Sequence, residues 1–90
     1  MITVETINNT TFKVTVSKTT TTTHTVTVSQ SYYEKLTNKC VKQEELVRRS
    51  FEFLLKRENN TSILRSFDLP VIGRYFPEYE RTIRGMLKSS

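Results

Sequence analysis

The sequence predicts a small α+β protein in which one or more N-terminal β-strands precede three to four short helices. Two observations carry this prediction. Residues 1–29 contain 12 of the 15 threonines, and their apolar residues alternate with polar ones, as in half-buried strands. From Ser29 onward, apolar residues recur at the spacing of amphipathic helices. With 90 residues, we expect a single domain.

The composition predicts a thin hydrophobic core. Hydrophobic residues make up 36% of the chain, and Trp and Ala are absent. One cysteine, Cys40, offers no intrachain disulfide, and together with one histidine it cannot complete a zinc site. A chain of this size buries only about 60–65% of its unfolded surface. We therefore expect a second copy to complete the core, most simply in a homodimer.

The sequence contains no apolar run of membrane-spanning length and no N-terminal secretory pattern. We therefore expect a cytoplasmic protein with no membrane association, in which Cys40 stays reduced. The net charge of +5 is compatible with binding to nucleic acid and equally with a solvated surface.

Two segments carry the strand pattern. In residues 11–17 the apolar residues Phe12, Val14 and Val16 share one face, and in residues 23–29 Val26 and Val28 do the same. Lys18 and five threonines lie between them, without a Gly, Pro, Asn or Asp to mark a tight turn. The strands either close a loose hairpin or are independent, because a threonine run fixes no register.

Helices follow the strands. Tyr32, Tyr33 and Leu36 predict a short helix that Ser29 or Ser31 caps and Asn38 ends. A longer helix is predicted over residues 42–57, with Phe53 on its flank. Its expected inner face consists of Leu46, Val47, Ser50, Phe51, Leu54 and Leu55.

Residues 59–90 are predicted to form a helical C-terminal tail. Residues 62–67 can be extended, residues 69–76 form a short turn, and Pro77 opens a last helix that runs to about Leu87. Three closely spaced aromatic residues in this tail either cover the small core or form a docking segment for another protein. They are Tyr75, Phe76 and Tyr79.

Catalysis is not indicated by the sequence, and we expect no enzyme, no cofactor and no bound metal. His24 falls in a strand and Cys40 in a turn, with no residue obviously placed to orient the imidazole. Two glycines, Gly73 and Gly85, cannot make a glycine-rich phosphate loop. We interpret His24 as an ordinary strand residue and Cys40 as a small buried hydrophobe.

The order of strand, short helix, turn and amphipathic helix over residues 23–58 resembles the ribbon-helix-helix family of repressors and antitoxins. The resemblance covers about two fifths of the chain and rests on residue types rather than fixed identities. It would make residues 1–22 an N-terminal extension and residues 59–90 the tail. The segments that carry it are Thr25-Val26-Thr27-Val28-Ser29, Gln30-Ser31-Tyr32-Tyr33-Glu34-Lys35-Leu36 and Glu45-Leu46-Val47-Arg48-Arg49-Ser50-Phe51.

In that family, two chains pair one strand each into a ribbon that enters the DNA major groove. The resemblance implies that Thr23, Thr25 and Thr27 contact bases. It also implies that the start of the second helix binds phosphate. The residues that would contact phosphates are Lys42, Gln43, Arg48 and Arg49. Tyr75, Phe76 and Tyr79 would then dock a toxin or another protein, as such tails do in antitoxins.

Several features depart from the family pattern. The first helix is short, the second lacks a Ser or Thr cap, and Glu44 and Glu45 would oppose a phosphate. A hairpin would widen a two-chain ribbon to four strands, about 14 Å across, which exceeds the roughly 12 Å groove. The leading hypothesis is a dimeric DNA-binding transcriptional regulator or antitoxin. The alternative is a protein–protein interaction module with an intrachain hairpin and no DNA binding.

Overall fold

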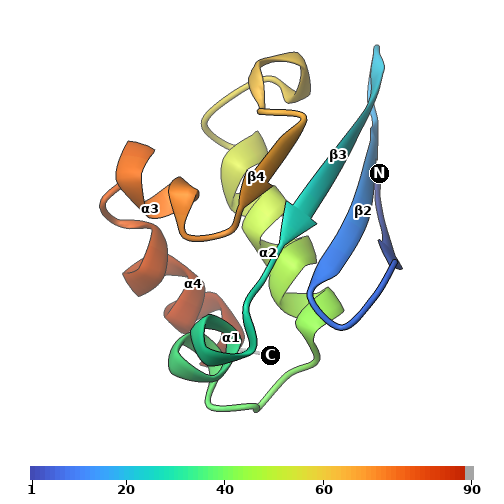
Figure 1. Cartoon of the computed structure of the whole chain (residues 1–90). Helices are drawn as coiled ribbons and strands as arrows, with labels where there is room; N and C mark the ends of the chain where they lie inside the picture. Colours follow the sequence, from blue (N-terminus) through green and yellow to red (C-terminus); the bar gives the residue numbers. More distant parts are fainter. Residues whose placement is uncertain (89–90) are drawn as a thin grey trace.

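The computed structural model describes residues 1–88 and confirms the α+β class. Strands come first in the chain, and four α-helices, a short 3-10 helix and one further strand follow (Figure 1). The strands are β1 (Ile2–Thr6), β2 (Thr11–Ser17), β3 (Thr21–Thr27) and β4 (Ser66–Asp68). The helices are α1 (Gln30–Thr37), α2 (Gln43–Leu55), the 3-10 helix η1 (Asn60–Ser62), α3 (Val71–Tyr75) and α4 (Tyr79–Lys88).

The strands form one mixed sheet in the order β1-β2-β3-β4. β2 pairs antiparallel with both β1 and β3, whereas β4 pairs parallel with β3. β2 and β3 close an intrachain hairpin in which Ser17 lies opposite Thr21. This corrects the expected ribbon-helix-helix-like arrangement of one free strand per chain, because β3 already has a neighbour on each edge. β3 also begins and ends two residues before the expected range of 23–29.

Two strands were not anticipated from the sequence. β1 places residues 2–6 in the sheet, with Ile2 opposite Val16 and Val4 opposite Val14. β4 falls partly inside the segment 62–67 that was expected to be extended. The backbone N–H of Thr25 donates to the Arg65 carbonyl at 2.7 Å, which joins this late segment to the hairpin.

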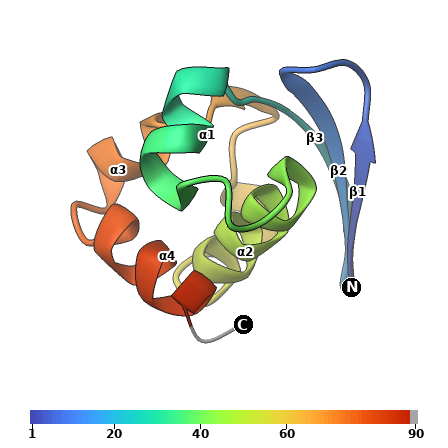
Figure 2. The same cartoon turned by 90° about the horizontal axis from the view of Figure 1, so that it is seen from below.

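The helices cover one face of the sheet and leave the other face bare (Figure 2). Alternation directs Phe12, Val14, Val16 and Val26 into the covered layer, where each is at most 1% exposed. Helix α2 runs against this layer and contacts both β1 and α4. The core therefore lies between the sheet and the helices, with β-branched residues on one side and leucines and aromatic rings on the other.

The ends of α1 follow the expected signals. The Ser29 hydroxyl accepts a hydrogen bond from the Tyr32 N–H at 3.2 Å, and Asn38 ends the helix in the left-handed region with φ of 53°. α2 begins after Lys42 without a side-chain cap, also as expected. Two expectations were wrong. Phe53 is fully buried rather than on a flank, because α4 packs over it, and Cys40 is exposed because it lies in the turn between α1 and α2.

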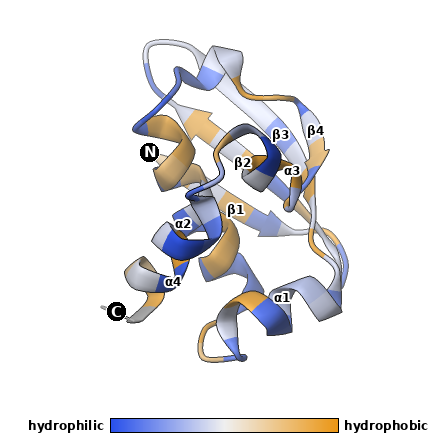
Figure 3. Cartoon of the chain, turned by 90° about the vertical axis from the view of Figure 1, so that its left-hand side faces the viewer, coloured by the Kyte–Doolittle hydropathy of each residue, from blue (hydrophilic) through white to orange (hydrophobic). Residues whose placement is uncertain are grey.

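Polar and apolar residues are mixed along the helices (Figure 3). Within residues 1–88, no helix has the length and apolar character needed to cross a membrane. The last helix begins after Pro77, close to the expected position, and α3 takes up only part of the expected turn at 69–76.

Candidate functional site

The threonines expected to contact DNA bases lie on the bare face of the sheet. Thr23 and Thr27 are exposed, Thr25 is half-buried, and all three alternate with the inward-facing His24 and Val26. We call this surface the hydroxyl face, because β2 contributes Thr11 and Thr15 to it as well. The three threonines therefore share one surface, as expected, but on a strand in the interior of a four-stranded sheet.

The residues expected to contact phosphates lie in the helix layer, on the other side of the sheet. Lys42 is exposed, and the Gln43 amide donates to the Gln30 side chain at 3.2 Å. Arg48 donates to the Ile2 carbonyl at 2.6 Å. Arg49 pairs with Glu45 at 2.8 Å and with Glu52 at 3.2 Å. The structure thus gives three of these four side chains partners within the chain and does not bring them onto the hydroxyl face.

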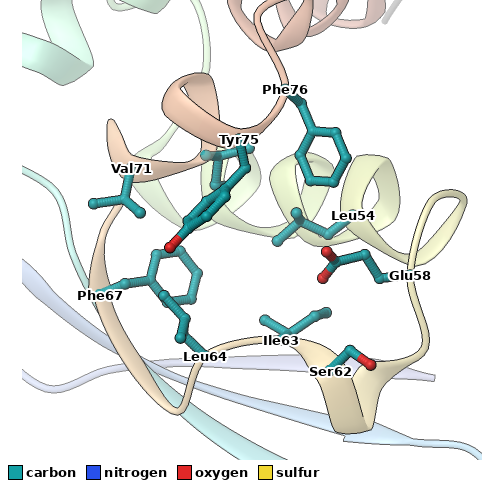
Figure 4. A pocket seen from close by; sticks show the side chains of 10 residues that line it. Leu54, Glu58, Ser62, Ile63, Leu64, Phe67, Val71, Tyr75 and Phe76 are labelled. Atoms are coloured by element: carbon teal, nitrogen blue, oxygen red, sulfur yellow. The ribbon is translucent and has the colours of Figure 1, made fainter.

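An apolar cavity of about 210 Å³ lies beside the C-terminal end of α2 (Figure 4). The segments that enclose it are the end of α2, the chain from η1 to β4, and α3. Its lining residues are Leu54, Glu58, Ser62, Ile63, Leu64, Phe67, Val71, Ile72, Tyr75 and Phe76. We call this cavity the α2–α3 pocket.

The mouth of the α2–α3 pocket exposes large apolar side chains. Tyr75 is 67% exposed and Leu64 is 48% exposed. Among the described residues, the other large apolar side chains with such exposure are Met1 and Ile7, near the N-terminus. Exposed aromatic and aliphatic groups around a concave surface are typical of a binding site.

The walls of the pocket rest on packed aromatic rings. The Phe67 ring lies 6.1 Å from that of Phe51, which in turn lies 5.3 Å from His24. On the other wall, Phe76 meets Phe53 edge-on at 5.8 Å. Because these inner rings are buried in the core, they hold the outer rings in place, and the pocket is preformed rather than assembled from loose side chains.

Glu58 contributes the one charged side chain among the described residues that line the pocket. Figure 4 shows its carboxylate directed into the cavity, with the Tyr75 ring on another wall. Within residues 1–88 this carboxylate has no hydrogen-bond or ion-pair partner, whereas the neighbouring Arg57 pairs with Glu78 at 3.2 Å. The site therefore combines an apolar floor with one carboxylate that forms no ion pair within residues 1–88.

A partly buried chain of hydrogen bonds holds the rim of the pocket. His24 Nδ1 lies 2.7 Å from the Leu64 carbonyl, which can only accept, so this nitrogen carries the proton. His24 Nε2 then accepts from the Thr22 hydroxyl at 2.9 Å, and Asn60 Nδ2 donates to the same hydroxyl at 3.0 Å. His24 is thus a strand residue, as expected; it is also buried in the core, and its ring holds the backbone of Leu64.

The three tail aromatics separate into different roles. Tyr75 and Phe76 line the pocket, whereas Tyr79 is fully buried against Phe53. The Tyr79 hydroxyl lies 2.6 Å from Ser50 Oγ, and Ser50 donates to the Leu46 carbonyl at 2.8 Å, so Tyr79 donates to Ser50. Burial raises the pKa of Tyr79 well above its ordinary value. Tyr79 therefore covers the core, whereas Tyr75 and Phe76 lie at the pocket.

Sequence reasoning missed Glu58 and Leu64. Neither residue belongs to a sequence pattern that would indicate a binding role. The pocket forms only in the folded chain, where the segment after η1 meets α3. No group of three or more His, Cys, Asp or Glu side chains that could hold a metal ion occurs in the part of the chain that the structure describes.

The fold and the pocket define a two-layer α+β protein with an apolar pocket in its helix layer. Comparison with known proteins adds no relative: no family model, no curated protein and no solved structure matches this chain.

Proposed function

We propose that this protein is a protein–protein interaction module that captures an apolar side chain of a partner polypeptide in the α2–α3 pocket. The observation that carries the proposal is the preformed cavity of about 210 Å³ with Tyr75 and Leu64 exposed at its mouth. Drug-sized ligands and cofactors usually occupy about 300–1,000 Å³. The smaller volume suits one or two side chains of a docked segment.

The chemistry of the rim supports the same proposal. Aromatic residues at the centre of an interface contribute a large share of binding energy, because they bury much area at little conformational cost. Tyr75 offers a ring and a hydroxyl, and Leu64 offers apolar area beside it. The partner expected for an antitoxin-like tail would be one example of such a polypeptide.

Selection from a displayed peptide library tests the proposal directly. Peptides that bind the protein should share an aromatic or long aliphatic anchor. They should lose at least tenfold in affinity for Tyr75→Ser, and they should bind Thr23→Ser, a matched change on the hydroxyl face, as tightly as the unmodified protein. Peptides that bind Tyr75→Ser unchanged would place the interaction elsewhere and refute the proposed site.

Binding to duplex DNA stays a prediction of the ribbon-helix-helix resemblance. It requires contacts from Thr23, Thr25 and Thr27, and it requires affinity that falls steeply between about 50 and 200 mM salt. Fluorescence anisotropy with a labelled duplex measures both. Salt-sensitive binding that Thr25→Val abolishes would favour the regulator hypothesis over the interaction module.

A further inference from the structure

We infer that the α2–α3 pocket selects a segment in which the apolar anchor stands next to a lysine or arginine. This inference rests on the proposed function and specifies its partner. Glu58 carries it: the carboxylate lines an otherwise uncharged cavity, is directed into it, and has no partner within residues 1–88 (Figure 4). A cation brought in beside the anchor would supply that missing partner.

The surroundings of Glu58 sharpen the selection. Leu54, Ile63 and Leu64 are apolar, so a charge docked among them loses water and finds few competing hydrogen bonds. A neutral or acidic neighbour of the anchor would leave the carboxylate desolvated without compensation. Three exposed cations, Arg57, Arg65 and Arg74, adjoin pocket residues along the chain, but none of them lines the cavity. Arg57 pairs with Glu78 at 3.2 Å, and within residues 1–88 none of the three forms an ion pair with Glu58.

The occupant is a polypeptide segment rather than a free amine, because of the shape of the rim. Tyr75 and Leu64 extend apolar surface beyond the cavity itself, being more exposed than the floor residues Leu54 and Ile72. A backbone that continues on both sides of the anchor would cover this surface. A small amine would fill the cavity and leave the rim in water.

Amide chemical-shift titrations with short capped peptides test the inference. The probes are Ac-Gly-Phe-Lys-Gly-NH2 and its Gln and Glu counterparts, and phenethylamine serves as the free amine. We expect the Lys peptide to bind about fivefold more tightly than the Gln peptide, which is typical of a partly exposed ion pair. Glu58→Gln should remove this preference, whereas Glu5→Gln, a matched loss of a carboxylate on the hydroxyl face, should preserve it.

The outcomes separate the inference from the function on which it rests. Equal affinities for the three peptides, all lost in Tyr75→Ser, would overturn the charge selection and leave the pocket as an interaction site. Tighter binding of phenethylamine than of any peptide would overturn the polypeptide occupant. Absence of shifts at Glu58, Leu64 and Tyr75 with every probe would overturn both proposals.

Discussion

His24, Thr22 and Asn60 show how single polar residues hold this fold together. Each is wholly or largely buried, and each finds a partner in another element: β3 supplies His24 and Thr22, and η1 supplies Asn60. Asn60 also donates to the Thr20 carbonyl at 2.8 Å, at the tip of the β2–β3 hairpin. Hydrogen bonds of this kind fix the geometry of a loop that apolar contacts alone would leave adjustable.

His24→Leu should destabilise the protein. The substitution keeps an apolar body of similar size but leaves the Leu64 carbonyl and the Thr22 hydroxyl without their shared partner. Leaving buried polar groups unsatisfied costs about 1–3 kcal/mol. Urea unfolding measures the loss, and Thr23→Val, on the exposed face of the same strand, should change stability by less than about 0.5 kcal/mol. Equal stability of the His24 variant and the unmodified protein would contradict the proposed role.

We expect Tyr79 to make the stability of the protein fall at alkaline pH. The unfolded chain ionises this tyrosine near its ordinary pKa of 10.0, whereas burial keeps the folded form protonated well beyond that value. The folded state therefore binds more protons above pH 10. The contribution of Tyr79 is complete below this pH and is lost by about 1.4 kcal/mol for each unit above it.

Comparison of Tyr79→Phe with the unmodified protein isolates this effect from the titration of lysines. Unfolding free energies measured about one unit below and one unit above pH 10 should fall less in the variant. At neutral pH the variant should be less stable by about 0.5–1.5 kcal/mol, because the Ser50 hydroxyl loses its donor. Parallel pH profiles for the two proteins would show that Tyr79 ionises freely in the folded state.

At the scale of elements, β1 depends on α2 for its position. Ile2, Val4 and Thr6 direct their backbone groups away from β2, because the alternate residues Met1 and Ile7 make hydrogen bonds to it. Arg48 of α2 donates to the outward Ile2 carbonyl at 2.6 Å, and the Thr6 hydroxyl donates to Glu44 at 2.8 Å. Two side-chain hydrogen bonds thus join the edge strand β1 to α2.

Arg48→Met should loosen β1 without unfolding the sheet. Met keeps much of the apolar stem of Arg but cannot donate to Ile2. Hydrogen exchange at the Thr3 and Glu5 amides, which face β2, should accelerate several-fold, while exchange in the β2–β3 hairpin stays unchanged. Lys42→Met, at the exposed position just before α2, is the control. Uniform acceleration across the whole sheet would instead indicate that Arg48 supports global stability.

The sequence predicts elements well where a periodic pattern is long. The 13 residues of α2 repeat their apolar positions over several turns, and its start, its uncapped N-terminus and most of its buried face were predicted correctly. β1 shows the same alternation as β2, through Ile2 and Val4, but is too short to stand out. β4 has three residues and owes its strand conformation to pairing with β3, some 40 positions earlier. Pairing between strands that lie far apart in the chain produces no pattern in the sequence of the strand itself.

The candidate site was less predictable than the fold. Tyr75 and Phe76 could be predicted as candidate docking residues, because aromatic side chains are enriched in binding hot spots. Tyr79 shares their spacing, and only the packing of α4 on α2 shows that it belongs to the core. Glu58 and Leu64 could not be predicted as site residues, because they are brought together only by the cavity that forms where separate segments meet.

At the scale of the whole molecule, the outer edge of β1, which pairs with no other strand among the described residues, is where a second copy would add. β3 has neighbours on both sides, and β4 is only three residues long, so an expected homodimer would pair β1 with its twin about Val4. Val4→Pro removes the backbone N–H that faces away from β2, so it should disrupt pairing with a second copy without breaking a hydrogen bond to β2. Val4→Thr keeps this N–H and serves as the control. Light scattering should show a dimer for the unmodified protein and Val4→Thr, and a monomer for Val4→Pro. A dimer that survives Val4→Pro would use another surface.

The molecule presents two contrasting surfaces, the hydroxyl face of the sheet and the apolar pocket of the helix layer. Mapping amide shifts of the labelled protein with a library-selected peptide, and separately with duplex DNA, shows which surface binds. We predict saturable shifts at Glu58, Leu64 and Tyr75 with the peptide and none at Thr23, Thr25 and Thr27 with DNA. Saturable shifts of these threonines with DNA, and a silent pocket with the peptide, would contradict the account.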